Sequence, residues 1–286
     1  MGKRVICGAI ALLAALALFW VDRFVGGVVL GFLGVLLAAG GLAELFSLGR
    51  RAGLQPFTGI GVLVGGLLLP YAMIMPSAAR GVPSPETLFG LHLIPFILLF
   101  LMLLFAASRR PGPLRPQLGN VSFTAFGVLY MAVPLMFLAR TRLLDPDGWG
   151  YVLLIVAVAE VGDIGAYFTG KGLGRHKLAP RISPNKTVEG AIGGLAASML
   201  AAALVAWIFR LEGLTQGGIF PIMAFGALVG IAGQAGDLTA SFIKRCAEAK
   251  DSGGVLPAMG GVLDLIDCLL VAGPVGYCIL VAWLRI

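Results

Sequence analysis

The sequence predicts an all-α polytopic membrane protein with about nine transmembrane helices and a cytoplasmic amino terminus. Of the 286 residues, 59% are hydrophobic and only 12% are charged, whereas soluble domains carry roughly 25% charged residues. The 21 basic and 14 acidic residues cannot supply the polar surface that a soluble domain of this length needs. The high apolar content also excludes an intrinsically disordered chain. Because lipid offers the backbone no hydrogen-bond partners, apolar runs that cross a membrane must be helical.

Nine apolar runs have about the 20 residues that a helix needs to cross a hydrocarbon core of about 30 Å. The first run follows Lys3 and Arg4 as a secretory signal would, but the many later runs favour a first membrane helix. Pro70 and Pro134 lie inside runs, where membrane helices tolerate them as kinks. The predicted spans are 5–21, 24–46, 56–77, 87–107, 119–139, 149–169, 188–209, 218–243 and 262–284.

The distribution of Lys and Arg predicts the orientation in a cell membrane. With the amino terminus in the cytoplasm, 15 of the 21 basic residues lie on the cytoplasmic side and 6 on the other side, as the positive-inside rule requires. The loops 170–187 and 244–261 then lie together in the cytoplasm. The basic residues are dispersed between apolar runs, so the net charge of +7 does not indicate a nucleic-acid partner.

The chain is predicted to form one membrane domain, 1–286, with two unlike halves. Residues 1–147 are mostly apolar sequence with short loops. Residues 148–286 carry the specific polar residues, and nine of the 14 acidic residues lie between positions 160 and 267. The four cysteines lack metal-finger spacing and are expected to pack among apolar residues. The second half is therefore the predicted catalytic half.

Carboxylates at membrane depth are the clearest indication of a site. Glu160 and Asp163 share one helical face, and so do Asp264 and Asp267. A charge at that depth costs at least ~3 kcal/mol, and neighbouring carboxylates repel one another unless a cation lies among them. Hard oxygen ligands of this kind suit magnesium better than zinc. Helix ends that point these side chains to water are the alternative explanation.

A polar stripe continues the eighth run towards the cytoplasm. Asp237, Ser241, Lys244, Arg245 and Glu248 recur on one face of a helix. A carboxylate, a hydroxyl and two cations on one stripe suit a bound phosphate and metal. A simple interfacial helix end with extended basic side chains is the alternative.

The loop 170–190 is strongly basic, with five cations and one Glu. Thr187 and Glu189 suit the start of a helix, where free N–H groups attract anions. Glycines let a backbone wrap around phosphate oxygens. Topogenic positive charge would explain the net charge of the loop but not its Gly, Ser and Thr residues. The loop is therefore predicted to bind phosphate.

Deep carboxylates and two cationic loops, without a plausible Ser, Cys or His nucleophile, indicate phosphoryl or nucleotidyl transfer at a membrane surface. Such chemistry depends on positioning, a metal and charge neutralisation. A phosphomonoester acceptor, with a second pKa of roughly 6, is already anionic and requires no general base.

These motifs resemble those of the CDP-diacylglycerol synthases (phosphatidate cytidylyltransferases). The family pattern runs Ser-x-x-Lys-Arg, Lys-Asp, Pro-Gly-His-Gly-Gly and Asp-Arg-x-Asp, and the segment 241–267 is similar to it. The upstream segments 163–171, 183–190 and 236–237 also look like the family. Met259 replaces the family's His and Leu265 replaces its Arg. The other charged positions are kept, which favours an active variant.

The resemblance implies transfer of a cytidylyl group from CTP to phosphatidate, giving CDP-diacylglycerol and pyrophosphate for phospholipid biosynthesis. It implies bound Mg²⁺, with or without a second, monovalent cation, and a homodimer is compatible with it. It assigns Asp237, Asp264 and Asp267 to the metal, and Asp237, Lys244, Arg245, Asp251 and Asp264 to catalysis. It assigns Asp163, Lys171, Ser183, Lys186, Thr187, Glu189, Ser241 and Lys250 to substrate binding.

Two other functions remain open. Carboxylates inside a membrane also mark ion or solute pathways in transporters, although here the polar residues gather in one half and on one side. A catalytically silent relative of the family is the second alternative, and Met259 and Leu265 are the residues that favour it.

Overall fold

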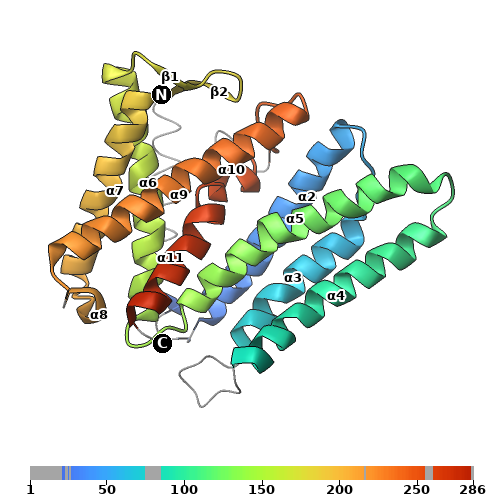
Figure 1. Ribbon diagram of the computed structural model, residues 1–286, viewed down its shortest axis with the longest axis horizontal. Coiled ribbons are helices and arrows are strands. Elements are labelled where there is room, and N and C mark those ends of the chain that lie inside the picture. Colours follow the sequence, from blue (N-terminus) through green and yellow to red (C-terminus); the bar gives the residue numbers. More distant parts are fainter. Residues whose placement is uncertain are drawn as a thin grey trace.

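The computed structural model describes residues 21–22, 25, 27–74, 85–215, 217–254 and 260–284. These residues form helices and one two-stranded antiparallel hairpin (Figure 1). Six of the described helices are long and apolar enough to cross a membrane, and two shorter apolar helices accompany them. The chain is therefore an all-α, multi-pass membrane protein, as its composition predicts.

The described part of the first half consists of α2 (Val28–Arg51), α3 (Thr58–Ile74), α4 (Pro85–Arg109) and α5 (Leu114–Thr141). Phe46 of α2 and Met131 of α5 are fully buried at the centre of its core. Leu263 and Leu270, which come from the last helices of the chain, belong to the same core. The two halves therefore share buried apolar surface, which is the main force that holds them together.

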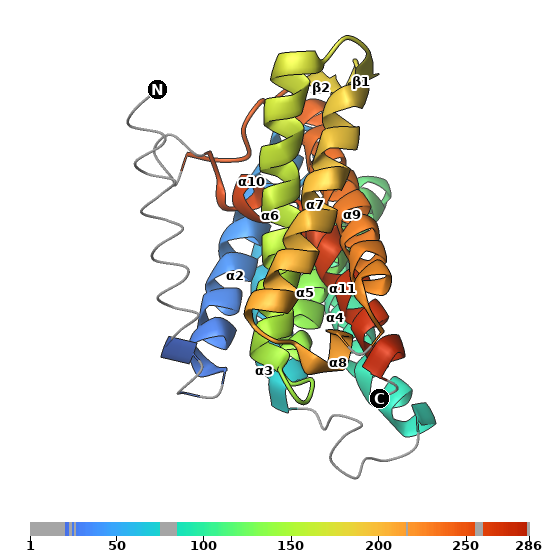
Figure 2. The ribbon, with the colours of Figure 1, turned by 90° about the vertical axis from the view of Figure 1, so that its left-hand side faces the viewer.

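The second half consists of α6 (Gly148–Leu173), β1 (Lys177–Ala179), β2 (Ser183–Thr187), α7 (Val188–Ile208), α8 (Glu212–Thr215), α9 (Ile219–Cys246), α10 (Val262–Ile266) and α11 (Leu269–Leu284). Helices α6, α7 and α9 lie side by side in both views (Figures 1 and 2). The hairpin β1–β2 lies at the end of α6 and the start of α7 (Figure 2).

Small residues let α6 and α7 approach closely, as is common between membrane helices. A Cβ atom added to Gly165 would lie 2.4 Å from the Cβ of Ala197, and one added to Gly193 would lie 2.4 Å from the Cβ of Thr169. Neither position has room for a side chain. The close contact packs the part of α6 around Asp163 against Gly194 and Ala197 of α7.

The predicted spans from 24–46 onward each correspond to helical segments, and the span 5–21 lies outside the described residues. Two spans, 56–77 and 87–107, appear as the shorter apolar helices Thr58–Ile74 and Leu93–Arg109. Helices α3 and α5 continue through their internal prolines. The count of nine crossings and the orientation remain predictions.

Three local features refine the expected elements. The predicted helix start at Thr187 is confirmed, because its hydroxyl oxygen accepts a hydrogen bond from the Gly190 amide at 3.1 Å. The basic loop contains the hairpin β1–β2, which its sequence did not predict. The last span is interrupted between α10 and α11, so that Asp267 and Cys268 stand at a break in the helix.

The close approach of α6 and α7 predicts that a larger residue at this contact lowers the stability of the protein. The variant Gly193→Ala is expected to lose about 1–3 kcal/mol through overpacking, because its methyl group would overlap Thr169. Gly172→Ala is the matched control, since a Cβ there meets no atom within 4 Å. Thermal unfolding in detergent should show a lower Tm for the first variant only. An equal Tm for both variants would show that this contact does not limit packing.

Candidate functional site

A cavity opens between α6, α7, α9 and the hairpin. Its volume is about 490 Å³, within the range of roughly 300–1,000 Å³ that small-molecule sites occupy. Carboxylates and cations face each other across it. The charged and polar residues that line it include Asp163, Lys171, Asn185, Lys186, Thr187 and Asp237.

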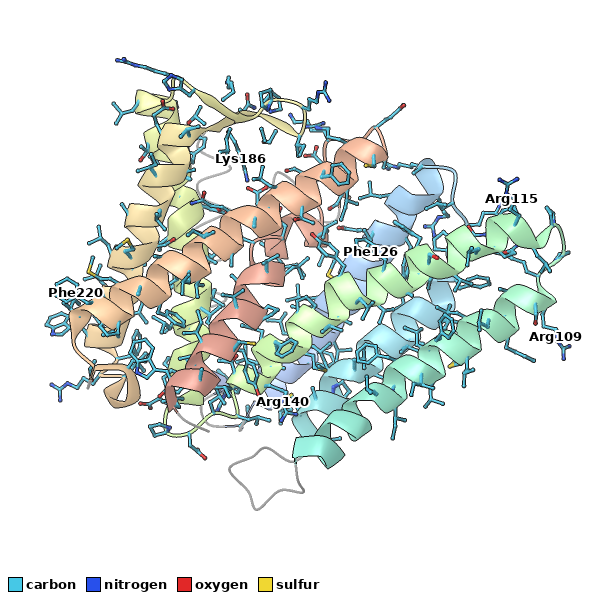
Figure 3. The ribbon with its side chains drawn as sticks, viewed as in Figure 1. Arg109, Arg115, Phe126, Arg140, Lys186 and Phe220 are labelled. Atoms are coloured by element: carbon cyan, nitrogen blue, oxygen red, sulfur yellow. The ribbon has the colours of Figure 1, made fainter. Side chains whose placement is uncertain are left out.

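The Lys186–Asp237 ion pair joins the hairpin to α9 across this cavity. Figure 3 shows Lys186 beneath the hairpin, on its α9 side. Ser241, one turn further along α9, donates a hydrogen bond to Oδ1 of Asp237 at 3.3 Å. The side chains of Lys186 and Asp237 are 26% and 24% exposed, so both remain accessible to a ligand in the cavity.

Asp264 is held in a second, more buried cluster. Its Oδ1 pairs with the ammonium of Lys244. Its Oδ2 accepts hydrogen bonds from the Ser252 amide at 2.9 Å, the Ser252 hydroxyl at 2.9 Å and the Gly261 amide at 3.0 Å. The Lys244 and Asp264 side chains are only 11% and 12% exposed. Both oxygens of Asp264 are therefore already engaged.

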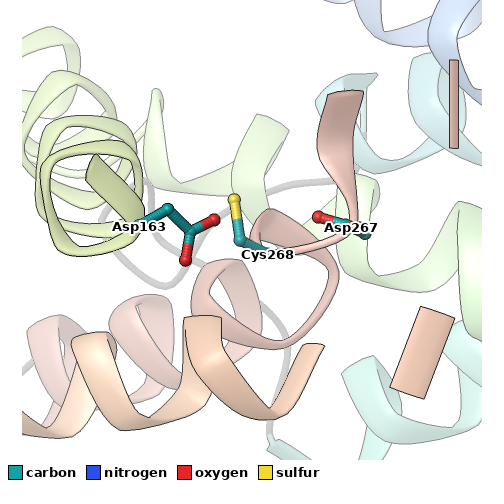
Figure 4. A group of neighbouring side chains, drawn as sticks. All are labelled: Asp163, Asp267 and Cys268. Carbon is teal, nitrogen blue, oxygen red and sulfur yellow. The ribbon is translucent and has the colours of Figure 1, made fainter. Parts of the chain in front are cut away.

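A third cluster lies where α10 gives way to α11. Ligand atoms of Asp163, Asp267 and Cys268 all lie within 4.8 Å of one another. Figure 4 shows the Asp163 side chain extending from α6 towards Cys268, with Asp267 on the far side. Asp267 is 8% exposed and Cys268 is 2% exposed. The two carboxylates suit a hard cation, whereas the buried thiol has the character of a packing residue.

This grouping differs from the predicted metal set. The sequence grouped Asp237, Asp264 and Asp267, and placed Asp163 with the substrate. Among the described residues, the ligand atoms that lie within 4.8 Å of one another belong to Asp163, Asp267 and Cys268, and the metal set itself stays a prediction. The two carboxylates Asp264 and Asp267 share a helical face in sequence, but the helix ends between them and their side chains enter different clusters.

Two further predicted residues hold loops in place. Arg245 donates from Nε to the Ile182 carbonyl at 3.1 Å and from Nη1 to the Ala249 carbonyl at 3.2 Å. Glu189 accepts hydrogen bonds from the backbone amides of Arg175 and His176 at 3.0 and 3.2 Å. These contacts fix the hairpin and the segment between α6 and β1. Neither the Arg245 nor the Glu189 side chain lines the cavity.

The remaining predicted residues lie at the edges of the site. Lys171 stands at the rim of the cavity, with its Nζ 5.9 Å from the ring centroid of Tyr167. Ser183 begins β2 and is partly buried. Lys250 and Asp251 are exposed in the turn after α9. Met259 lies outside the described residues, and Leu265 is 39% exposed on α10.

Several polar residues of the site were not predicted. Asn185 and Gln234 line the cavity, and Gln234 donates to the Ala191 carbonyl at 3.0 Å. Glu44 reaches the Asp264 cluster from α2 and accepts a hydrogen bond from Ser252 at 2.8 Å. A lone carboxylate inside the apolar run 24–46 was the available signal for Glu44.

Comparison with known proteins covers nearly the whole chain. A model of the cytidylyltransferase family matches residues 2–283. The chain is 32% identical to the phosphatidate cytidylyltransferase of Bacillus subtilis (strain 168) over 285 residues, which are 98% of this chain and 97% of that protein. It is 32% identical to the phosphatidate cytidylyltransferase of Staphylococcus haemolyticus (strain JCSC1435), over 91% of this chain and 93% of that protein. Its identity to the phosphatidate cytidylyltransferase of Brucella suis biovar 1 (strain 1330) is 43%, over 54% of this chain and 55% of that protein.

The two carbonyl contacts of Arg245 predict that a lysine cannot replace it. Arg245→Lys keeps the charge, but an ammonium group lacks the planar fork that reaches both carbonyls. We expect trypsin to cut the hairpin of this variant several-fold faster than that of the wild type. Arg115→Lys, in the first turn of α5, is the control and should leave the hairpin cutting rate unchanged. If Arg245→Lys is cut at the wild-type rate, the contacts do not hold the hairpin.

Proposed function

The chain belongs to the cytidylyltransferase family, and on this premise we propose that it transfers a cytidylyl group from CTP to phosphatidate. The products are CDP-diacylglycerol and pyrophosphate. The names of its relatives supply the two substrates. The observation that carries the proposal is the cavity itself, which Lys171, Lys186, Asp163 and Asp237 all line. Cations that can bind phosphates and carboxylates that can bind a divalent metal thus share one cavity.

We propose that the cavity faces the cytoplasm. Basic residues are concentrated in the hairpin, in the turn between α4 and α5 and at the end of α9. The positive-inside rule places these segments in the cytoplasm. The last turns of α6 and α9 contain Lys171, Lys244 and Arg245. With the cavity at the cytoplasmic surface, the headgroup of a lipid can enter it while the acyl chains stay in the bilayer.

The reaction needs two bond changes. A phosphate oxygen of phosphatidate attacks the α-phosphorus of CTP, and a new P–O bond forms. The bond from that phosphorus to the oxygen bridging the β-phosphate breaks, and its electron pair leaves with pyrophosphate. Lys186 and Lys171 neutralise the triphosphate, while Asp237 holds Lys186 in position. The attacking phosphate is already anionic, so no side chain must remove a proton.

We propose Mg²⁺ as the cofactor, with or without a monovalent cation. Asp163 and Asp237 line the cavity, and the ligand atom of Asp267 lies within 4.8 Å of that of Asp163. All three carboxylates offer hard oxygen ligands, which suits Mg²⁺. Asp264, the remaining predicted ligand, would join them only if Lys244 released its Oδ1, since its Oδ2 already accepts hydrogen bonds from two backbone amides and lies 2.9 Å from the Ser252 hydroxyl. When bound, the cation supplies charge neutralisation to phosphate oxygens.

The Asp264 cluster predicts loss of turnover in Asp264→Asn. The amide keeps the shape, but it removes the charge that pairs with Lys244 and puts an NH₂ group where an oxygen accepted hydrogen bonds. We expect conversion of radiolabelled CTP into a lipid-extractable product to fall by about 100-fold or more. Asp147→Asn, at the start of α6, is the control and should keep wild-type turnover.

Asp264→Asn can also unfold the protein, because a buried Lys244 ammonium without a partner lowers the free energy of unfolding by about 3–5 kcal/mol. The double variant Asp264→Asn with Lys244→Met removes both charges. It should elute as a folded protein in size-exclusion chromatography and remain inactive. Wild-type turnover in either variant would refute the role of Asp264. Cation flux into vesicles with no product from the wild type would instead identify a transporter.

The Lys186–Asp237 pair predicts a binding defect. Lys186→Met keeps the aliphatic stem but removes the cation, and a hydrogen bond to a charged group contributes about 1.5–3 kcal/mol. We therefore expect the KM for CTP to rise by about 10- to 100-fold. The matched control is Lys177→Met, because Lys177 lies exposed on β1 outside the cavity lining. An unchanged KM in Lys186→Met would remove Lys186 from the substrate site.

A further inference from the structure

We propose that Glu44 is a positioning residue for Asp264, a role that rests on the proposed function. Glu44 lies on α2, in the half of the chain to which the sequence assigned no part of the site. It is only 8% exposed, and it does not line the cavity. Its action on the reaction is therefore indirect, through the segments that its carboxylate holds.

The Glu44 carboxylate binds the start of α10 and the turn after α9 together. Oε1 accepts a hydrogen bond from the Val262 amide at 2.9 Å. Oε2 accepts from the Leu263 amide at 3.0 Å and from the Ser252 hydroxyl at 2.8 Å. Three donors satisfy a charge that would otherwise be costly to bury.

The surrounding glycines let the carboxylate come this close. A Cβ atom on Gly253 would lie 2.4 Å from Oε1 of Glu44, and a Cβ on Gly261 would lie 2.2 Å from Oε2. These residues flank the two segments that Glu44 joins. The turn and the start of α10 are thus packed directly onto the carboxylate.

Asp264 binds the same two segments from the other side. It accepts hydrogen bonds from the Ser252 amide and hydroxyl and from the Gly261 amide. The Ser252 hydroxyl lies 2.8 Å from Glu44 and 2.9 Å from Asp264, yet it has one hydrogen to donate. A shift in either carboxylate therefore changes the contacts of the other, and with them the orientation of Asp264 towards Lys244.

Glutamine cannot replace Glu44 in this role. It has the same length, but one of its terminal groups is an NH₂ donor. One of the three donors now directed at Glu44 would then face another donor. At least one contact to α10 or Ser252 must be lost, and the start of α10 would lose its fixed position relative to α2.

Asp22 provides a matched control for a purely structural role. It is also a buried carboxylate of the first half, and it is 0% exposed. It accepts hydrogen bonds from the Leu30 amide at 3.0 Å and from Nε of Arg142 at 3.1 Å, and neither partner belongs to the site. If buried carboxylates of this half act only on stability, Asp22→Asn and Glu44→Gln will have the same effects.

The test combines kinetics with amide hydrogen exchange on the full-length protein in lipid-containing micelles. In Glu44→Gln we expect kcat to fall by about 10- to 100-fold, with the KM for CTP within about twofold because Lys171 and Lys186 are untouched. Amides in the segments 250–254 and 260–266 should exchange faster. Asp22→Asn should keep kcat within about twofold and leave this exchange unchanged. The KM comparison separates positioning of Asp264 from loss of substrate binding.

Ser252→Ala keeps the proposal testable if Glu44→Gln does not fold, because it removes only the hydroxyl between the two carboxylates. It should lower kcat and accelerate the same exchange. Wild-type kcat in Glu44→Gln, unchanged exchange, or an equal kcat loss in Asp22→Asn would each overturn the proposal. If the wild type itself forms no CDP-diacylglycerol, the proposed function fails, and the exchange data still decide whether Glu44 fixes the Asp264 cluster.

Discussion

A carboxylate buried in a membrane protein must be paired with a cation or with several hydrogen-bond donors, because an unpaired buried charge costs several kcal/mol. In this chain the pairing also joins elements that are distant in sequence. Lys186 joins the hairpin to α9 through Asp237, and Lys244 joins α9 to α10 through Asp264. The ion pairs that shape the site therefore also hold separate elements of the fold together.

The two halves contribute differently to this arrangement. Helices α6, α7 and α9 form the cavity together with the hairpin, and glycines of α6 and α7 allow these two helices to approach closely around Asp163. The first half supplies a buried apolar core that includes residues of α10 and α11. It also supplies Glu44, which accepts hydrogen bonds from the first amides of α10. The first half is mostly apolar in sequence, yet it contacts the site directly through Glu44.

Local signals in the sequence predicted the helices and the residues that each would present. Hydropathy located the spans, and Thr187 marked the start of α7. Asp237, Ser241, Lys244 and Arg245 of the predicted stripe lie on α9, because their periodicity is a property of a single element. Glu248 does not, because α9 ends at Cys246 and Glu248 has a positive φ of 52°. Which carboxylates meet depends instead on the approach of separate helices and on the break at Asp267, and spacing along one helix carries no such information. Glu44 is also a carboxylate inside an apolar run, like the other deep carboxylates. It was missed because only the approach of α2 to α10 shows that it contacts the site.

The most direct test of the function is pyrophosphate release by the purified wild-type protein in lipid-containing micelles, with CTP, phosphatidate and Mg²⁺ each omitted in turn. The account predicts release only when all three are present, with one CDP-diacylglycerol formed for each pyrophosphate. Release that persists without phosphatidate would contradict transfer to a lipid phosphate. No release from a folded protein that binds CTP would contradict the proposed acceptor.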